Sequence, residues 1–269
     1  MIELEVLASG SRGNTALLTL GSSEGGDTLF MLDAGLSPRR TRKALETRGR
    51  THRDIAGVLL THGDGDHLHG GWAKAIGSWG FKIHTHASHV NRVRASGIAP
   101  EYIAEFDREI VFTDTHIETA LAPHDTHGTV VYVVRHNDAV VGWATDVGRI
   151  DAALASFLRS ASPHILGIES NYDREMQAQS GRPPFLIDRI TGGWGHLSNN
   201  EAMDIVVELD DACELQHVVL LHRSEQCNCP RVIESLWRDR APHMLDRITI
   251  ASQHEASGAI AVTMDRCPT

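Results

Sequence analysis

The sequence predicts an α/β fold in which two mixed sheets pack face to face and helices cover both outer sides. Three observations predict it. Short apolar runs of strand length recur along the chain, amphipathic segments of helical period alternate with them, and a strand-rich stretch with polar turns lies in the middle of the chain. No stretch of the 269 residues has the composition of a linker, so we expect residues 1–269 to form a single domain.

The first part of the chain is predicted to alternate strands with helices. The Gly/Ser/Asp-rich stretch 21–27 predicts a turn between two strands, and Pro38 is typical of the first turn of a helix. We expect strands at 3–7, 15–20, 28–32, 55–60 and 81–84, and helices at 38–48, from about Asp66 to Ile76, and at 87–96.

A strand-rich stretch follows, and the helical pattern then returns. Polar turns separate the runs 117–122, 130–135 and 140–145, which predicts antiparallel pairing. Ser198 and Glu201 form a capping box that marks the start of a helix. The remaining expected elements are helices at 150–159 and 230–240 and strands at 165–169, 217–221 and 258–264.

Composition excludes several classes of protein. The N-terminus lacks the basic start and apolar stretch of a signal peptide, and no apolar run approaches the roughly 18 residues of a membrane span, so we expect a cytoplasmic protein without a membrane partner. The four cysteines, Cys213, Cys227, Cys229 and Cys267, are too few to staple a chain of this size, which fits a reducing compartment. Cys227 and Cys229 could bind metal as a C-x-C pair. No second pair accompanies them, which favours a role without metal.

The formal charge of −10 argues against a protein that coats nucleic acid indiscriminately. A local basic segment nevertheless runs from Arg39 to Arg53 on a predicted helix. It has two interpretations, a solvated helix face or a contact with a phosphate backbone.

The segment Thr61 to Gly71 is the most informative part of the chain, because it places potential metal ligands on a turn that leaves a buried strand. The ligands are His62, Asp64, Asp66 and His67. Unpaired polar groups cost several kcal/mol to bury. Such a cluster therefore needs solvent or a cation, and a divalent metal satisfies imidazoles and carboxylates together.

Three further strand ends carry potential ligands. His124 and Asp125 follow one predicted strand, Asp146 follows a second and His222 follows a third. The carboxyl ends of strands are the edge where sheet-based active sites are usually built. We therefore expect these side chains to join the central cluster.

The ordered set Asp33, His62, Asp64, Asp66, His67, His124, Asp146 and His222 resembles the five motifs of the metallo-β-lactamase superfamily. Within it, the segments 7–14, 169–173, 195–199 and 222–224 are similar to the WalJ (YycJ) branch. The resemblance implies the four-layer αββα sandwich and a metal-dependent 5′-to-3′ DNA exonuclease. Superfamily relatives also hydrolyse lactams, thioesters, lactones and small phosphodiesters, because the fold alone does not fix the function.

The resemblance also implies a set of ligands for two divalent ions, zinc or manganese. One ion would be held by His62, Asp64 and His124, the other by Asp66, His67 and His222, with Asp146 bridging. Asp64 departs from the family pattern, which has histidine there. A carboxylate at this position favours manganese over zinc, and a one-metal state stays open if its shorter side chain misses the ion.

We expect hydrolysis by a metal-bound hydroxide, with Asp66 and Asp146 at the metals. His196 would protonate the leaving group or bind phosphate, although a structural role at the helix start is an equal alternative. Asp33 and Asp125 would hold the ligand geometry through hydrogen bonds. The expected substrate contacts are Ser9, Ser11, Asn14, Asn171 and Arg223.

Other side chains are expected to pack. His84, His86 and His89 follow a predicted strand as cavity wall or packing, with a substrate contact by His86 left open. We expect Trp72, Trp79, Trp143 and Trp237 to lie in the core instead of stacking on bases.

Three hypotheses for function follow. The first is a phosphodiesterase that acts on nucleic-acid ends, DNA in preference to RNA. The second is a hydrolase of a small substrate such as a cyclic phosphate, lactone or thioester, which the acidic charge favours. The third is a non-catalytic relative that binds a ligand. The sequence leaves the oligomeric state open.

Overall fold

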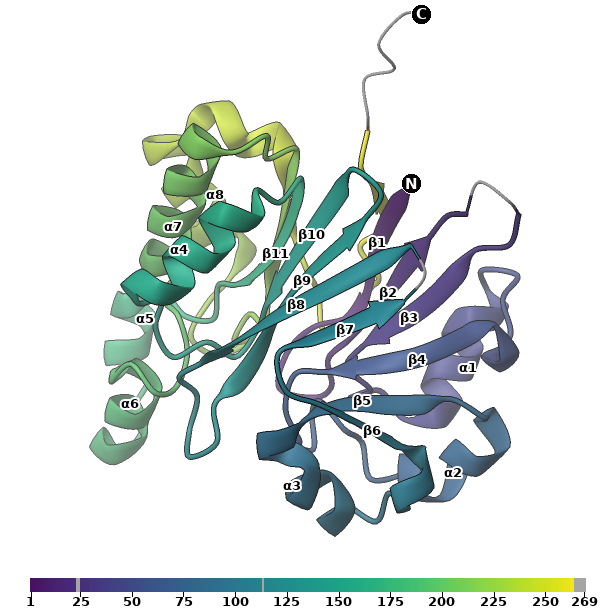
Figure 1. The fold of residues 1–269 in the computed structure, drawn as a ribbon. Coiled ribbons are helices and arrows are strands. Elements are labelled where there is room, and N and C mark those ends of the chain that lie inside the picture. Colours follow the sequence, from purple (N-terminus) through teal and green to yellow (C-terminus); the bar gives the residue numbers. More distant parts are fainter. Residues whose placement is uncertain (23–24, 113, 264–269) are drawn as a thin grey trace, which may run out of the picture.

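The computed structural model describes residues 1–22, 25–112 and 114–263, and it has four layers in which helices enclose two central sheets (Figure 1). This arrangement confirms the predicted fold class. The predicted end of the last strand at Met264, and Cys267, lie outside the described residues. Within the described part of the chain, every helix is too short or too polar to cross a bilayer.

The first sheet has the order β14-β1-β2-β3-β4-β5-β6. Its pairs from β14 to β3 are antiparallel and its pairs from β3 to β6 are parallel. Its strands are β1 (Ile2–Ala8), β2 (Thr15–Leu20), β3 (Thr28–Leu32), β4 (Ile55–Leu60), β5 (Lys82–His86), β6 (Ile103–Phe106) and β14 (Ala259–Ala261).

The second sheet has the order β13-β12-β11-β10-β9-β8-β7. The pairs from β7 to β10 are antiparallel, as the polar turns predicted, and those from β10 to β13 are parallel. Its strands are β7 (Glu109–Phe112), β8 (Thr115–Ala122), β9 (Thr129–His136), β10 (Ala139–Ala144), β11 (Ile165–Glu169), β12 (His217–Leu221) and β13 (Ile248–Ile250).

Helices cover the outer face of each sheet (Figure 1). On the first sheet lie α1 (Pro38–Glu46), α2 (Trp72–Trp79) and α3 (Val90–Ala95), and on the second lie α4 (Ala152–Ala161), α7 (Asn199–Ala212) and α8 (Pro230–Arg240). Two short helices, α5 (Arg174–Ala178) and α6 (Pro184–Thr191), lie between β11 and α7 in the chain. Short 3₁₀ turns occur at His52–Asp54, Ala87–His89, Pro100–Tyr102 and Pro242–Arg247.

Apolar side chains fill the space between the sheets. Alternate residues of β1, such as Ile2, Leu4 and Val6, pack with residues of β9 and β10, such as Tyr132 and Trp143. The period-two pattern of these strands places one set of side chains between the sheets and the other under the helices. This core fixes the two sheets relative to each other and so fixes the strand ends that carry the polar cluster.

The helix predicted from about Asp66 is wrong, because α2 begins only at Trp72 and the segment before it is a loop. Glycines at 63, 65, 70 and 71 disfavour a helix. The loop also pairs with the chain after β3: Ala34 donates to the carbonyl of His67 at 2.8 Å, and His69 donates to the carbonyl of Ala34 at 2.9 Å. These backbone bonds hold the ligand-rich segment beside the chain that leaves the C-terminal end of β3.

Candidate metal centre

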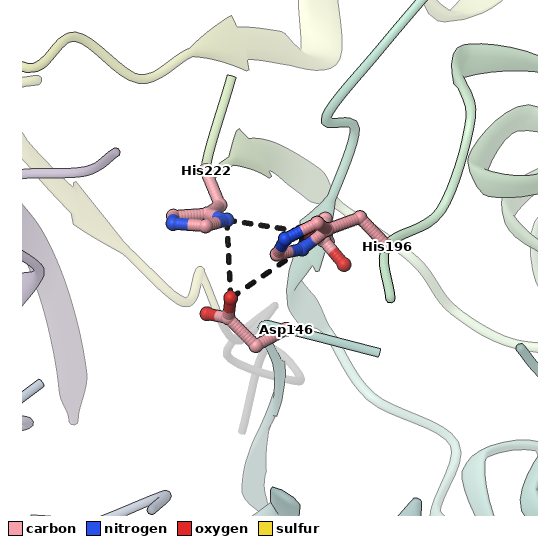
Figure 2. A group of neighbouring side chains, drawn as sticks. Asp146, His196 and His222 are labelled. Atoms are coloured by element: carbon pink, nitrogen blue, oxygen red, sulfur yellow. Dashed lines mark hydrogen bonds and ion pairs between the residues drawn. The ribbon is translucent and has the colours of Figure 1, made fainter. Parts of the chain in front are cut away.

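The strand ends predicted to carry ligands meet at one edge of the two sheets. His62 and His67 follow β4, His124 follows β8, and Asp146 and His222 follow β10 and β12. All five side chains are buried. The neighbouring loop before α7 adds His196, and in Figure 2 the carboxylate of Asp146 points toward the imidazoles of His196 and His222.

The backbone is strained at these positions. Asp33, Asp146 and His222 have positive φ angles of 60°, 54° and 50°, and Asp125 has 40°. Non-glycine residues in this region cost on the order of 1–3 kcal/mol each and persist where the surroundings impose them. Three of the four residues, Asp33, Asp146 and His222, belong to the cluster or contact it directly, so the unusual backbone coincides with the site.

Asp146 is the centre of the cluster. One oxygen, Oδ2, lies 2.8 Å from His67 Nε2. The other, Oδ1, lies 3.2 Å from His222 Nδ1 and 3.9 Å from His124 Nε2. A carboxylate that faces three imidazoles from different strand ends has the position of a bridging ligand.

A second carboxylate, Asp66, faces two of the same imidazoles. Its Oδ2 lies 3.5 Å from His222 Nε2 and 3.9 Å from His67 Nε2. His222 Nε2 is buried and has no hydrogen-bond partner among the described residues. Donor atoms of Asp66, His67 and His222 lie within 4.8 Å of one another, as do those of His62, His67 and Asp146. A buried ring nitrogen without a partner, opposite a carboxylate, is what a cation would satisfy.

His62 and His124 form the other side of the centre. Their ring centroids are 5.0 Å apart, and the His62 ring is 4.1 Å from that of His67. His124 Nδ1 lies 2.8 Å from the carbonyl oxygen of Gly195, a contact that places its proton on Nδ1 and leaves Nε2 as the acceptor. Asp64 lies at the rim: its Oδ1 is 3.9 Å from His62 Nε2 but 2.9 Å from the guanidinium of Arg92.

Buried polar side chains fix the imidazoles. Asp33 lies 2.7 Å from His67 Nδ1 and accepts the backbone amide of Thr61 at 2.8 Å. Asn14 Nδ2 lies 2.9 Å from His67 Nε2, and Ser9 Oγ accepts the backbone amide of His222 at 2.8 Å. These contacts hold the rings in place before any ligand binds.

The charges of the cluster shift its pKa values in opposite directions. Burial alone would lower the pKa of His67, but the carboxylates of Asp146 and Asp33 outweigh it and hold that pKa well above its ordinary value. For His222, burial is likewise outweighed by Asp146, Asp66 and Glu169, which raise the pKa to about 10. For His62, burial and the neighbouring His67 outweigh the carboxylate of Asp146 and hold the pKa well below its ordinary value.

Comparison with protein families identifies the arrangement. The family model described as the beta-lactamase superfamily domain matches residues 28–222, which include all of these candidate ligands. The chain belongs to the β-lactamase superfamily. This confirms the resemblance inferred from its motifs.

Individual relatives agree with the family. The chain is 27% identical over 232 residues to a protein named exodeoxyribonuclease YycJ from Bacillus anthracis, and the match covers 83% of each chain. Among solved structures it is similar to the metallo-β-lactamase fold protein YhfI from Bacillus subtilis, with a TM-score of 0.66, 13% identity and coverage of 95% of this chain and 98% of the other. It is also similar to Zn²⁺-bound PqqB from Methylobacterium extorquens, with a TM-score of 0.65, 16% identity and coverage of 94% and 99%.

A cavity of about 480 Å³ opens onto the candidate metal centre. Of the residues expected to contact substrate, Ser11 and Asn171 line it, whereas Ser9, Asn14 and Arg223 do not. Ser9 and Asn14 are buried and contact the ligand histidines instead. Asp125 lines the cavity and pairs with Arg189, whose guanidinium holds the pKa of Asp125 below its usual range.

The basic segment from Arg39 to Arg53 lies away from the cavity. Arg39 and Arg40 are exposed on the outer helix α1, and Arg48 and Arg50 pair with Glu5 and Asp27. Of the described residues that line the cavity, none falls in this segment. Its placement favours the solvated helix face.

Several site residues escaped sequence reasoning. Glu169, the last residue of β11, is fully buried, and its Oε1 lies 2.7 Å from His196 Nδ1 and 3.0 Å from His222 Nδ1. Its place at a strand end, in a segment already similar to the WalJ branch, was the available signal. Arg182 and Arg189, which line the cavity, follow no strand and carry no motif, so nothing in the sequence marked them.

The packing residues lie largely as expected. Trp72, Trp79, Trp143 and Trp237 are buried, which confirms the prediction. The remaining histidines of that prediction also pack: His84 contacts the rings of Phe30 and Phe112, and His86 lies 2.8 Å from Ser88 Oγ. His89 is buried without a hydrogen-bond partner among the described residues.

Cys227 is buried. In the described part of the chain, neither Cys227 nor Cys229 belongs to a group of side chains that could hold a metal ion.

Proposed function

We propose that the protein is a metal-dependent hydrolase of phosphodiester bonds in nucleic acid, acting on DNA ends in preference to RNA. One observation carries the proposal. The imidazoles of His67, His124 and His222 converge from three strand ends on Asp146, and buried His222 Nε2 has no hydrogen-bond partner among the described residues. A stable fold does not need this cluster, and a divalent cation satisfies it.

The residues present fit two divalent ions, zinc or manganese. Asp66, His67 and His222 would hold one, His62 and His124 the other, and Asp146 would bridge them. Asp64 would be the third ligand of the ion held by His62 and His124, while its carboxylate also pairs with Arg92. When bound, such ions lower the pKa of water and polarise phosphoryl oxygens for in-line attack.

The residues of the chain would supply the proton. His196 lines the cavity, and its Nδ1 is held at 2.7 Å by the buried carboxylate of Glu169. Burial would raise the pKa of Glu169, but His196 and His222 outweigh it and keep Glu169 ionised. The contact leaves Nε2 of His196 for the cavity, where it donates a proton to the oxygen that leaves as the P–O bond breaks.

Two observations support nucleic acid as the substrate. The superfamily relative from Bacillus anthracis bears the name exodeoxyribonuclease over a match that covers 83% of this chain. Arg182 and Arg189 line the cavity, and their positive charge favours a substrate with a phosphate backbone.

The test is to incubate the zinc- or manganese-loaded protein with 5′-phosphorylated single- and double-stranded DNA, with RNA and with bis(p-nitrophenyl) phosphate. Progressive shortening of DNA from the 5′ end is the expected result. Turnover of the small ester alone would favour a small-substrate hydrolase, which a cavity of about 480 Å³ would also accommodate. No hydrolysis of any substrate with either metal would point to a non-catalytic relative that binds a ligand.

A further inference from the structure

Two aromatic side chains of a segment that lines the cavity are largely exposed. Phe185 is 73% exposed and Trp194 is 53% exposed. In the described part of the chain, the other large apolar residues of this kind are Met1, Val111 and Leu121. Both rings belong to the same segment, from Arg182 to His196, which also supplies residues that line the cavity.

Phe185 lies one helical turn from the site. It precedes Arg189 by four residues on α6, a spacing that places both side chains on the same face of a helix. Arg189 lines the cavity and contacts Asp125, the neighbour of His124, at 2.9 Å. Leu186 and Ile190, the residues that follow Phe185 and Arg189, pack on Tyr172 and anchor α6, while Phe185 stays in solvent.

Trp194 stands on a rigid backbone at the same place. Its carbonyl accepts the amide of Asp125 at 2.7 Å. A Cβ at Gly148 would lie 2.7 Å from the Cα of Trp194, so the two backbones are in close contact. The guanidinium of Arg149 lies 4.8 Å from the centre of the Trp194 ring and braces it. The ring is thus held in position before a ligand arrives, which reduces the entropy lost on binding.

Charge and continuity identify the occupant of this surface. Arg149 contacts the Trp194 ring, and Arg182 and Arg189 of the segment that carries both rings line the cavity, so this surface bears positive charge that favours a polyanion. Leu186 and Gly195, the chain neighbours of the two aromatic residues, line the cavity that would hold the reacting phosphate under the proposed function. Aromatic side chains stack on unpaired bases with little sequence preference, whereas the bases of a duplex are already stacked.

We propose that Phe185 and Trp194 form a base-stacking platform that binds single-stranded nucleic acid next to the metal centre. The proposal deepens the function given above and rests on it for the identity of the polymer. The platform holds the bases of the strand while the adjacent phosphates run past Arg182 and Arg189 into the cavity.

Equilibrium binding tests the platform without cleavage. The metal-loaded protein is titrated into a 3′-labelled phosphorothioate oligothymidylate of 12 nucleotides, which resists hydrolysis, and into the same backbone without bases. We expect Phe185→Ala and Trp194→Ala each to weaken binding of the oligothymidylate about tenfold. Binding of the abasic strand, which offers nothing to stack on, keeps the same dissociation constant in both variants.

Matched variants separate stacking from loss of structure. Phe185→Tyr and Trp194→Phe keep an aromatic ring and should retain most of the affinity, whereas Val111→Ala, an exposed apolar residue on β7, should leave it unchanged. Equal losses on both strands, or no loss in either alanine variant, would overturn the proposal. So would a wild-type dimer that becomes monomeric in the double variant while DNA affinity stays constant, since the rings would then serve self-association.

The two proposals fail separately. DNA hydrolysis by the wild type with dissociation constants unaffected by Phe185→Ala and Trp194→Ala would refute the platform and leave the nuclease standing. Aromatic-dependent binding of the strand without hydrolysis by any metal form would refute the nuclease and leave the platform.

Discussion

Asp64 combines two contacts that compete for one carboxylate. It stands where the superfamily pattern has histidine, and its Oδ1 faces both His62 at 3.9 Å and Arg92 at 2.9 Å. The ion pair with Arg92 is half-exposed, so on its own it stabilises the fold little. Its main effect is to fix the carboxylate at the rim of the centre.

Replacing Asp64 tests whether it binds metal. Asp64→Ala should lower the metal content, and Asp64→His should raise the affinity for zinc relative to manganese, because imidazole is a softer donor than carboxylate. Elemental analysis after dialysis against each ion measures both effects. Unchanged metal content in Asp64→Ala would show that Asp64 serves only Arg92.

His196 is expected to act on substrate and not on the resting metal content. His196→Ala should lower kcat for DNA about 10²- to 10⁴-fold, because it removes the proton donor, while the metal content stays that of the wild type. Steady-state kinetics and elemental analysis on the same preparations separate the two. Full turnover in His196→Ala would assign this residue a structural role at the start of α7.

The raised pKa values of His67 and His222 predict a pH dependence of metal binding. Their carboxylate neighbours outweigh burial, so the pKa of His67 lies well above its ordinary value and that of His222 rises to about 10, which favours the protonated imidazoles in the metal-free protein. A metal must displace those protons, so its affinity should rise as pH increases from 6 to 9. Titration calorimetry in buffers of different ionisation enthalpy measures the protons released. Binding without proton release, at an affinity independent of pH, would contradict the assigned ligands.

Among the elements, the loop after β4 depends on one close approach of backbones. A Cβ on Gly35 would lie 1.8 Å from the carbonyl oxygen of Asp66 and 2.4 Å from the amide nitrogen of Asn14. Only glycine permits the chain after β3 to pass so close to the ligand loop. This contact places Asp66 and His67 against Asp33.

Gly35→Ala should therefore displace the ligand loop. We expect a loss of about 1–3 kcal/mol in the free energy of unfolding, as for other overpacked sites, together with weaker metal binding. Gly65→Ala is the matched control, because its Cβ would meet no atom within 4 Å. Chemical denaturation and metal titration of both variants measure the difference, and equal behaviour would show that the close approach is dispensable.

The elements of the core were predictable and those of the rim were not. The strands β2, β3, β4, β11 and β12 have the predicted bounds because each is a buried apolar run between polar residues. β6, β7 and β13 were missed because they are short strands with partly exposed side chains, and β13 and β7 lie at sheet edges. The helix expected from Asp66 failed because tertiary backbone bonds hold that glycine-rich segment as a loop.

For the molecule as a whole, the sequence indicates which residues follow strands but not how their side chains pair. Convergence of His62, His124 and His222 was predictable, because strand ends meet at one edge of a sheet. The contact of Glu169 with His196 spans 27 residues, and that of Asp64 with Arg92 joins the loop after β4 to helix α3. Such pairings depend on how the elements pack in three dimensions. Local sequence patterns give no information on that packing.

The net charge of −10 bears on how this molecule binds DNA. Two anions of this size repel each other at long range, so attraction must be local. Under the proposed function, cations at the centre and the arginines that line the cavity would supply it, whereas the basic segment on α1 lies elsewhere. The proposed function therefore requires that the metals be present when DNA binds.

The most direct test of the central claim is elemental analysis of the purified wild type and of Asp146→Asn, combined with DNA hydrolysis before and after chelation. Since Asp146 faces His67, His124 and His222, we predict stoichiometric divalent metal in the wild type, its loss in the variant, and hydrolysis that stops on chelation and returns with added metal. A wild type without bound metal that hydrolyses DNA equally fast after exhaustive chelation would contradict the account.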